Sequence, residues 1–159
     1  MLISSLQFGP MDVPEDKIIS MTKPVLGFEQ LDQFCLIERE ELLPFLWLQA
    51  TDDPEVAFMV MNPLMVDPSY RIEVNPKEVG ELTIRDVQKV ETYVIVTTHA
   101  DPEKITANMQ GPILINTENN LAKQLVLANS DYRVRESIMD ALDNITTPEE
   151  TRKSHAVFA

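Results

Sequence analysis

The sequence predicts a mostly β, single-domain fold, an antiparallel β-barrel-like body with one or two short helices. Short strand-like segments recur between turns rich in Pro, Asp and Asn, several of these segments are apolar on both faces, and helical spacing occurs in only two places. A chain of 159 residues makes one domain that buries about 70% of its unfolded surface. We assign residues 1–145 to this domain. Residues 146–159, "TTPEETRKSHAVFA" from Thr146, show no hydrophobic period and are expected to form a flexible C-terminal tail.

Nine strands are expected in chain order. In "YRIEV", Tyr70, Ile72 and Val74 alternate with charged residues, which is typical of a strand with one buried face. The segments "PFLWLQ", "VAFMVM", "TYVIVTT" and "GPILIN" are apolar on both faces, so we expect strands covered on both sides, as in a sandwich or a closed barrel. The expected strands are 2–8, 34–37, 45–49, 56–61, 70–74, 92–98, 104–109, 112–116 and 124–128.

The dipeptide Asp-Pro separates strands at 53–54, 67–68 and 101–102. Proline at the second position of a turn has its φ angle already set, and the preceding Asp side chain bonds the backbone that follows. Each of the three sites is therefore predicted to reverse or redirect the chain.

Two segments have helical spacing. Residues 82–90 predict a short helix capped by Thr83, with Asp86 at the capping-box position. Residues 134–145 have apolar side chains at helical spacing, and this stripe either docks on the barrel or receives a partner. Its residues are Val134, Ile138, Leu142 and Ile145.

Charge narrows the ligands that the surface can attract. The chain has 26 acidic and 13 basic residues and a net charge of −13. This excess argues against nucleic acid or an anionic membrane as direct ligands and permits a basic protein partner, although acid also serves solubility. The chain lacks a basic leader and a run of about 18 apolar residues, so we expect a cytoplasmic protein.

Residues with catalytic or metal-binding spacing are missing from the sequence. The two histidines, His99 and His155, do not have metal-ligand spacing, and the four glycines are too scattered for a phosphate loop. The single cysteine, Cys35, lies between apolar neighbours and is expected to be buried. We therefore expect no cofactor, no metal and no enzyme activity. Two other classes stay open: a small hydrolase using Asp101 with His99, and a self-assembling β-rich structural protein.

Three blocks of the sequence resemble one family. They are "DKIISMTKPVLGFEQLDQFCLIE", "PFLWLQATDDPEVAFMVMNPLMVDPSYRIEV" and "ADPEKITANMQGPILINTENNLAKQLVLANSDYRVR". In order and spacing they resemble the flagellar assembly factor FliW family, over about residues 1–140. The middle block is the most specific, because W-L-Q, D-P, A-F, N-P and D-P-x-Y occur together in it.

The resemblance implies a non-catalytic cytoplasmic β-barrel protein, monomeric when free, with two protein partners. It implies binding of flagellin as a chaperone before export and, in alternation, binding of the RNA-binding translational regulator CsrA, which couples flagellin translation to export.

Charge and the matched blocks together give the expected binding residues. Because an RNA-binding regulator carries basic surface, the CsrA-type patch is placed on acidic residues with one aromatic anchor. Its residues are Asp52, Asp53, Glu55, Asp67, Tyr70 and Glu73. The flagellin candidates lie in the C-terminal block, and for Asn116 and Gln124 the alternative is that they satisfy backbone groups in turns. They are Asn108, Met109, Asn116 and Gln124.

Overall fold

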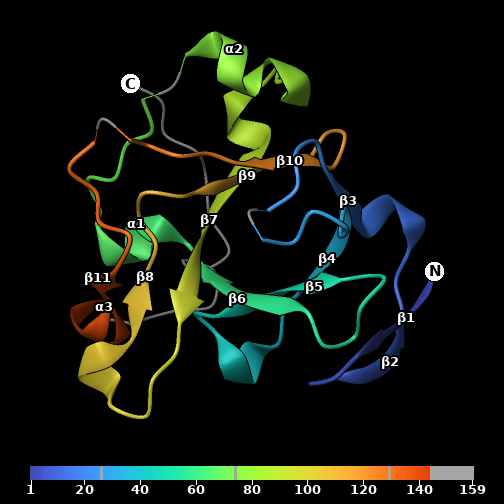
Figure 1. Cartoon of the computed structure of the whole chain (residues 1–159), viewed down its shortest axis with the longest axis horizontal. Coiled ribbons are helices and arrows are strands. Elements are labelled where there is room, and N and C mark those ends of the chain that lie inside the picture. Colours follow the sequence, from blue (N-terminus) through green and yellow to red (C-terminus); the bar gives the residue numbers. More distant parts are fainter. Residues whose placement is uncertain (26, 74, 129, 144–159) are drawn as a thin grey trace.

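A closed β-barrel forms the centre of the protein (Figure 1). The computed structural model describes residues 1–25, 27–73, 75–128 and 130–143. Seven strands follow one another around the ring, in the order β3-β4-β5-β6-β7-β9-β10, and β9 closes it by pairing with both β7 and β10. The strands are β3 (Ile18–Met21), β4 (Gln33–Ile37), β5 (Leu46–Ala50), β6 (Ala57–Met61), β7 (Val90–Thr97), β9 (Ile113–Asn116) and β10 (Leu121–Gln124). The predicted β-barrel class is confirmed.

All neighbouring strands in the ring are antiparallel except β10 and β3, which are parallel. An odd number of strands cannot alternate in direction around a closed ring, so one parallel pair is required. The pair registers Leu121 with Ser20 and Ala122 with Met21. Its bonds include Thr22 N to the Ala122 carbonyl at 2.8 Å.

Barrel strands bury side chains on both faces, as the sequence predicted. One cluster contains Phe34, Leu48, Val60 and Ile113. A second cluster contains Met61 and Leu114, which directly follow Val60 and Ile113 in the sequence. Successive side chains of a strand point to opposite faces. Val60 therefore packs in the barrel interior, whereas Met61 packs in a second core outside the barrel, which we call the outer core.

Short elements and loops cover the outer core on one side of the barrel (Figure 1). The strand β8 pairs with β7 and with β11. The covering elements are α1 (Pro63–Val66), α2 (Pro76–Val79), η3 (Gly80–Leu82), η4 (Val87–Lys89), η5 (Pro102–Lys104), β8 (Thr106–Ala107), β11 (Glu136–Ser137) and α3 (Met139–Asp143).

A separate hairpin of β1 (Leu2–Ser5) and β2 (Gly9–Asp12) packs elsewhere on the outside of the barrel. Ile3 of the hairpin shares a third apolar cluster with Cys35 and Ile37, and half-buried Trp47 packs against it. Cys35 is therefore buried, as expected. The 3-10 turns η1 (Glu15–Lys17) and η2 (Glu40–Leu42) lead from this region into the barrel strands β3 and β5.

Several predicted elements are corrected. The predicted strand 70–74 does not form over its described residues, 70–73; Ile72 makes a single bridge and is buried in the outer core. The expected helix 82–90 is replaced by η3 and η4, because Thr83 has a left-handed φ of 47° and ends η3 instead of starting a helix. Of the last predicted strand, 124–128, only Gln124 lies in a strand, because β10 covers Leu121–Gln124. The barrel strand β3 was not predicted.

The predicted helix 134–145 is also shorter than expected. Pairing of Glu136 and Ser137 with β8 holds that part of the chain extended, so α3 begins at Met139. Ile138 and Ala141 are buried in the outer core, which favours docking on the barrel over binding of a partner. The predicted tail, 146–159, lies outside the described residues.

The three Asp-Pro turns form as predicted. The side-chain oxygen of Asp53 accepts a hydrogen bond from Glu55 N at 3.0 Å. Asp67 and Asp101 bond the amide two residues on in the same way, at 2.9 and 3.1 Å. Each carboxylate replaces a backbone acceptor, which fixes the turn locally.

The turn between β9 and β10 yields a prediction. Asn120 has a left-handed φ of 58°, its carbonyl accepts from Ser20 N at the parallel pair, and its side chain donates to the Asp16 carbonyl. Asn120→Ala should lower the free energy of unfolding by about 2 kcal/mol, because it adds left-handed strain and loses the side-chain bond. Asn120→Gly loses only the bond and should cost about 1 kcal/mol less. Urea unfolding measures both, and equal losses would contradict this account.

Candidate functional site

The structure divides the predicted acidic patch into two surfaces. Asp52, Asp53 and Glu55 lie in the turn between β5 and β6, at the beginning of β6. The segment 67–73 follows α1, beyond the other end of β6, and lies on the opposite side of the barrel (Figure 1). The expectation of one continuous patch is therefore corrected, because the length of β6 separates its two halves.

A buried amide supports the first of these surfaces, the 52–55 turn. Gln49 is fully buried, and its Nε2 lies 3.1 Å from each of the carbonyl oxygens of Ala50, Asp53 and Val56. The two N–H groups of this amide are shared among these carbonyls, which ties the turn to β5, and the side chain of Asp52 is exposed. Repulsion between the acids is tolerated because the hydrogen bonds of Gln49 hold the backbone.

The second surface is a cleft of about 630 Å³ between the segments 67–78 and 126–132. We call it the acidic cleft, because four carboxylates and one guanidinium line it. It is lined by Asp67, Ser69, Arg71, Glu73, Glu78, Val126, Leu127, Ala128, Ser130, Asp131 and Tyr132. Val126 is 71% exposed and adds an apolar contact. Such a surface is complementary to a basic protein partner with a small apolar contact area.

Tyr70 lies beneath the acidic cleft instead of in its surface. The side chain is buried, its hydroxyl donates to the Met109 carbonyl at 2.7 Å, and its ring lies 4.5 Å from that of Tyr132. The Tyr132 hydroxyl in turn accepts from Arg71 N at 2.7 Å. Burial, followed by the proximity of Tyr132, raises the pKa of Tyr70 above its ordinary value. Tyr70 therefore positions the cleft and does not present its ring to a partner in this conformation.

Three of the four flagellin candidates come together at the turn 108–111. Met109 is buried, while Asn108 and Gln124 are half-buried around Gly111. Gln124 Nε2 donates to the Gly111 carbonyl at 3.0 Å. A Cβ on Gly111 would lie 2.8 Å from Asn108 Nδ2 and 3.0 Å from Gln124 Nε2, so glycine is what allows both amides to approach the turn.

Asn116 lies apart from the other three, at the end of β9. It is buried, and its Nδ2 donates to the Leu82 carbonyl at 2.9 Å while its Oδ1 accepts from Glu118 N at 3.1 Å. Asn116 thus satisfies backbone groups, which is the alternative that the sequence had left open for it. Gln124 also bonds a backbone carbonyl but remains partly exposed.

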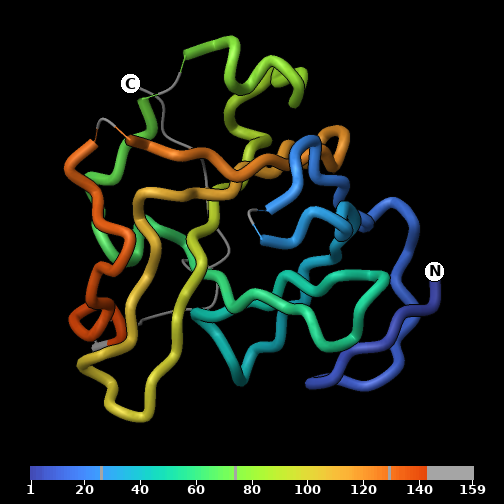
Figure 2. Tube along the Cα trace, viewed as in Figure 1, coloured from blue at the N-terminus to red at the C-terminus, as the bar shows by residue number. Residues whose placement is uncertain are grey.

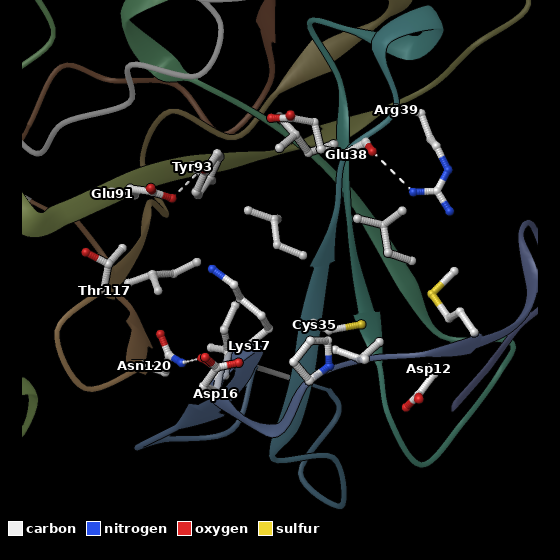
Figure 3. Close-up of a pocket in the computed structure, with 18 residues that line it drawn as sticks. Asp12, Asp16, Lys17, Cys35, Glu38, Arg39, Glu91, Tyr93, Thr117 and Asn120 are labelled. Carbon is white, nitrogen blue, oxygen red and sulfur yellow. Dashed lines mark hydrogen bonds between the residues drawn. The ribbon is translucent and has the colours of Figure 1, made fainter. Parts of the chain in front are cut away.

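A larger cavity, of about 770 Å³, opens where barrel strands begin or end (Figure 3). We call it the mouth cavity. The buried Tyr93 hydroxyl donates to Glu91 at 2.7 Å, and two basic side chains, Lys17 and Arg39, also line the mouth cavity. Burial, and then the negative charges of Glu91 and Glu38, raise the pKa of Tyr93. Sequence reasoning missed this cavity, because its lining comes from β2, η1, β3, β4, β5, β7 and β9 and no single motif contains it.

Neither cavity supports the hydrolase alternative. His99 Nδ1 accepts a hydrogen bond from Asp101 N at 2.9 Å, and both side chains are exposed and lie outside the lining of the two cavities. Cys35 lines the mouth cavity, but burial raises the pKa of its thiol, which favours the weakly nucleophilic protonated form.

Among the described residues, no group of three or more His, Cys, Asp or Glu side chains is placed to hold a metal ion. No helix within the described ranges has the length and apolar character to cross a membrane.

Known proteins share this architecture. A crystal structure of the flagellar assembly factor FliW superimposes with a TM-score of 0.81 at 30% identity and covers 87% of this chain and 96% of its own. The flagellar assembly factor FliW of Thermoanaerobacter pseudethanolicus is 37% identical over 145 residues, 91% of this chain and 97% of that protein. The flagellar assembly factor FliW of Leptospira interrogans is 39% identical over 140 residues, 87% of this chain and 93% of that protein.

Fold and surfaces together define a small closed β-barrel whose outer side carries an acidic cleft beside a turn with clustered amide side chains. The model of the FliW protein family matches residues 2–138. The chain belongs to the FliW family of flagellar assembly factors.

The environment of Tyr70 yields a prediction for alkaline pH. Its pKa is raised in the folded state, so its contribution to stability is fully present below the unfolded pKa of about 10 and is lost as pH rises toward the folded pKa. Above pH 10 the Tyr70 hydroxyl loses its proton more readily in the unfolded chain than in the folded one, so the free energy of unfolding should fall by about 1.4 kcal/mol per pH unit. Tyr70→Phe should remove that part of the slope and cost about 1–2 kcal/mol at pH 7, because the Met109 carbonyl loses its donor. Urea unfolding from pH 7 to 11 tests this, and parallel curves would refute it.

Proposed function

We propose that this chain binds flagellin in the cytoplasm before export and, when free of flagellin, binds a CsrA-type RNA-binding regulator and holds it away from RNA. In this proposal the protein is a non-catalytic, monomeric chaperone that couples flagellin translation to export. Membership of the FliW family carries the proposal, because its relatives are named as flagellar assembly factors. The net charge of −13 supports a basic protein partner.

Of the two acidic surfaces, we assign the regulator to the acidic cleft. A protein that holds RNA carries basic surface, and the cleft offers Asp67, Glu73, Glu78 and Asp131 within one concavity. The 52–55 turn adds to the long-range field that steers a basic partner and does not supply close contacts to it in this proposal.

We assign flagellin to the neighbouring turn 108–111. Asn108 and Gln124 are partly exposed there and offer amide groups, whereas buried Met109 and Asn116 act by holding the backbone. An amide carries both a donor and an acceptor, so it suits a peptide segment that folds or extends on binding.

Contacts between the two surfaces support alternation of the partners. The Tyr70 hydroxyl under the acidic cleft donates to the carbonyl of Met109 in the turn, and Met109 N donates to the Arg133 carbonyl at 2.9 Å. A partner that moves the turn therefore acts on the floor of the cleft, which is the coupling that alternation requires.

The direct test is titration of flagellin into a preformed complex of this chain with the regulator. We expect release of the regulator, and a stable ternary complex would contradict alternation.

The assignment of the regulator is tested by two variants of equal charge. Each replacement of an acid by lysine adds two charges, so Glu73→Lys with Asp131→Lys and Asp52→Lys with Glu55→Lys both change −13 to −9. The first pair should weaken binding of the regulator by about tenfold or more, through faster dissociation. The second pair should only slow association at low salt. Surface plasmon resonance at two salt concentrations separates these effects, and the reverse pattern would move the site to the 52–55 turn.

The assignment of flagellin is tested at Gly111. Gly111→Ala should push both flanking amides away and reduce flagellin affinity by about tenfold. The free energy of unfolding should fall by no more than about 1 kcal/mol, because the crowded atoms are side-chain ends. Gly80→Ala is the matched control, since no atom lies within 4 Å of that Cβ position. Unchanged affinity of Gly111→Ala, measured by calorimetry with purified flagellin, would exclude the turn.

A further inference from the structure

The β1–β2 hairpin is a sheet of two strands, and neither strand pairs with any other strand in the described part of the chain. It packs on the barrel through Ile3 and half-buried Phe8 and Met11. Figure 2 shows it beside the turn between β5 and β6, and the Leu6 N–H donates to the Pro54 carbonyl at 2.9 Å. The hairpin therefore has a fixed position next to the exposed acids Asp52 and Glu55.

The register shows which backbone groups of β1 face outward. Met1 and Val13 exchange both of their backbone hydrogen bonds, at 2.8 Å each. Hydrogen-bonded and non-hydrogen-bonded pairs alternate in an antiparallel ladder, so the N–H and C=O groups of Leu2 and Ser4 point away from β2. Within the described ranges these outward groups have no hydrogen-bond partner. β1 thus presents a free edge that ends at Leu6.

This edge lacks the usual protection of edge strands. Natural edges are blunted by proline, inward charge or a bulge, but β1 reads Leu-Ile-Ser-Ser. Leu2 is 77% exposed and Leu6 is 68% exposed, so two aliphatic side chains lie along the free edge. Exposed Asp52 and Glu55 belong to the turn that meets its Leu6 end, and their carboxylates form no hydrogen bond or ion pair within the described residues.

We infer that the free edge of β1 is a docking strip for an extended, basic segment of another protein, which adds as a third strand. The segment's backbone bonds to the outward groups of Leu2 and Ser4, its aliphatic side chains cover Leu2 and Leu6, and its lysines or arginines approach the 52–55 turn. A second copy of this chain is disfavoured, because each copy carries a net charge of −13 and two such copies repel each other. This inference does not depend on the proposed partners of the acidic cleft and the 108–111 turn.

The test uses an acetylated, amidated seven-residue peptide of alternating valine and lysine. The peptide is expected to add antiparallel to β1, so that valines opposite Leu2 and Ser4 share the face of Leu2 and their N–H groups bond to β1. N-methylation of the valines should weaken binding by about tenfold or more, whereas N-methylation of the lysines should leave it within about threefold. Bound peptide should slow hydrogen exchange of the Leu2 and Ser4 amides. Equal effects of both methylations, or protection at Glu73 and Asp131 instead, would overturn the inference.

Two protein variants complete the test. Ser4→Pro removes an outward N–H without removing a bond to β2 and should abolish peptide binding, with Ser4→Ala as the matched control. Leu2→Ala with Leu6→Ala leaves the backbone unchanged and should weaken binding even if the proline variant folds poorly. Protection of the Leu2 and Ser4 amides that grows with protein concentration in the absence of peptide would assign the edge to a second copy and overturn the inference.

Discussion

Closure of the barrel rests on the parallel contact between β10 and β3, and the positions of the other elements depend on it. The contact registers two residue pairs, and the asparagine-rich turn between β9 and β10 secures it. Asn120 bonds the Asp16 carbonyl, and Asn119 bonds the Leu82 carbonyl at 3.0 Å. Side-chain amides supply directional bonds where the ladder is too short to hold two strands alone, so one turn fixes η1, η3 and the last barrel strand together.

The closed ring also determines what remains on the surface for binding. Strands that are apolar on both faces need cover outside the barrel as well as packing within it, and that cover consists of loops and single turns. Loops on a rigid scaffold can carry side chains for recognition without destabilising the scaffold. The acidic cleft and the turn 108–111 arise in this cover, and Tyr70 joins them through the Met109 carbonyl.

Periodicity and turn chemistry identified five of the seven barrel strands and the Asp-Pro turns, because both depend on neighbours in sequence, but they missed β3 and all of β10 except Gln124. They failed where tertiary contacts override local preference: Ile72 is buried by the outer core instead of a strand ladder, and pairing with β8 extends Glu136 and Ser137. Site prediction placed Asp52 and Glu73 in one patch, although the strand β6 lies between them and its length puts them on different sides of the barrel. Burial of Tyr70 and the approach of Asn108 and Gln124 to Gly111 come from residues far apart in the chain, so no local pattern announces them.

The parallel contact also has a consequence for the newly made chain. It joins Thr22 to Ala122, 100 positions later. At a synthesis rate of about 5–20 residues per second, β3 waits roughly 5–20 s for its partner to leave the ribosome. Until then the growing sheet from β3 to β7 has two open edges and an incomplete core, and contacts between residues so distant in sequence form slowly. Completion of this protein, and hence its supply to any partner, is therefore set by the emergence of its C-terminal third.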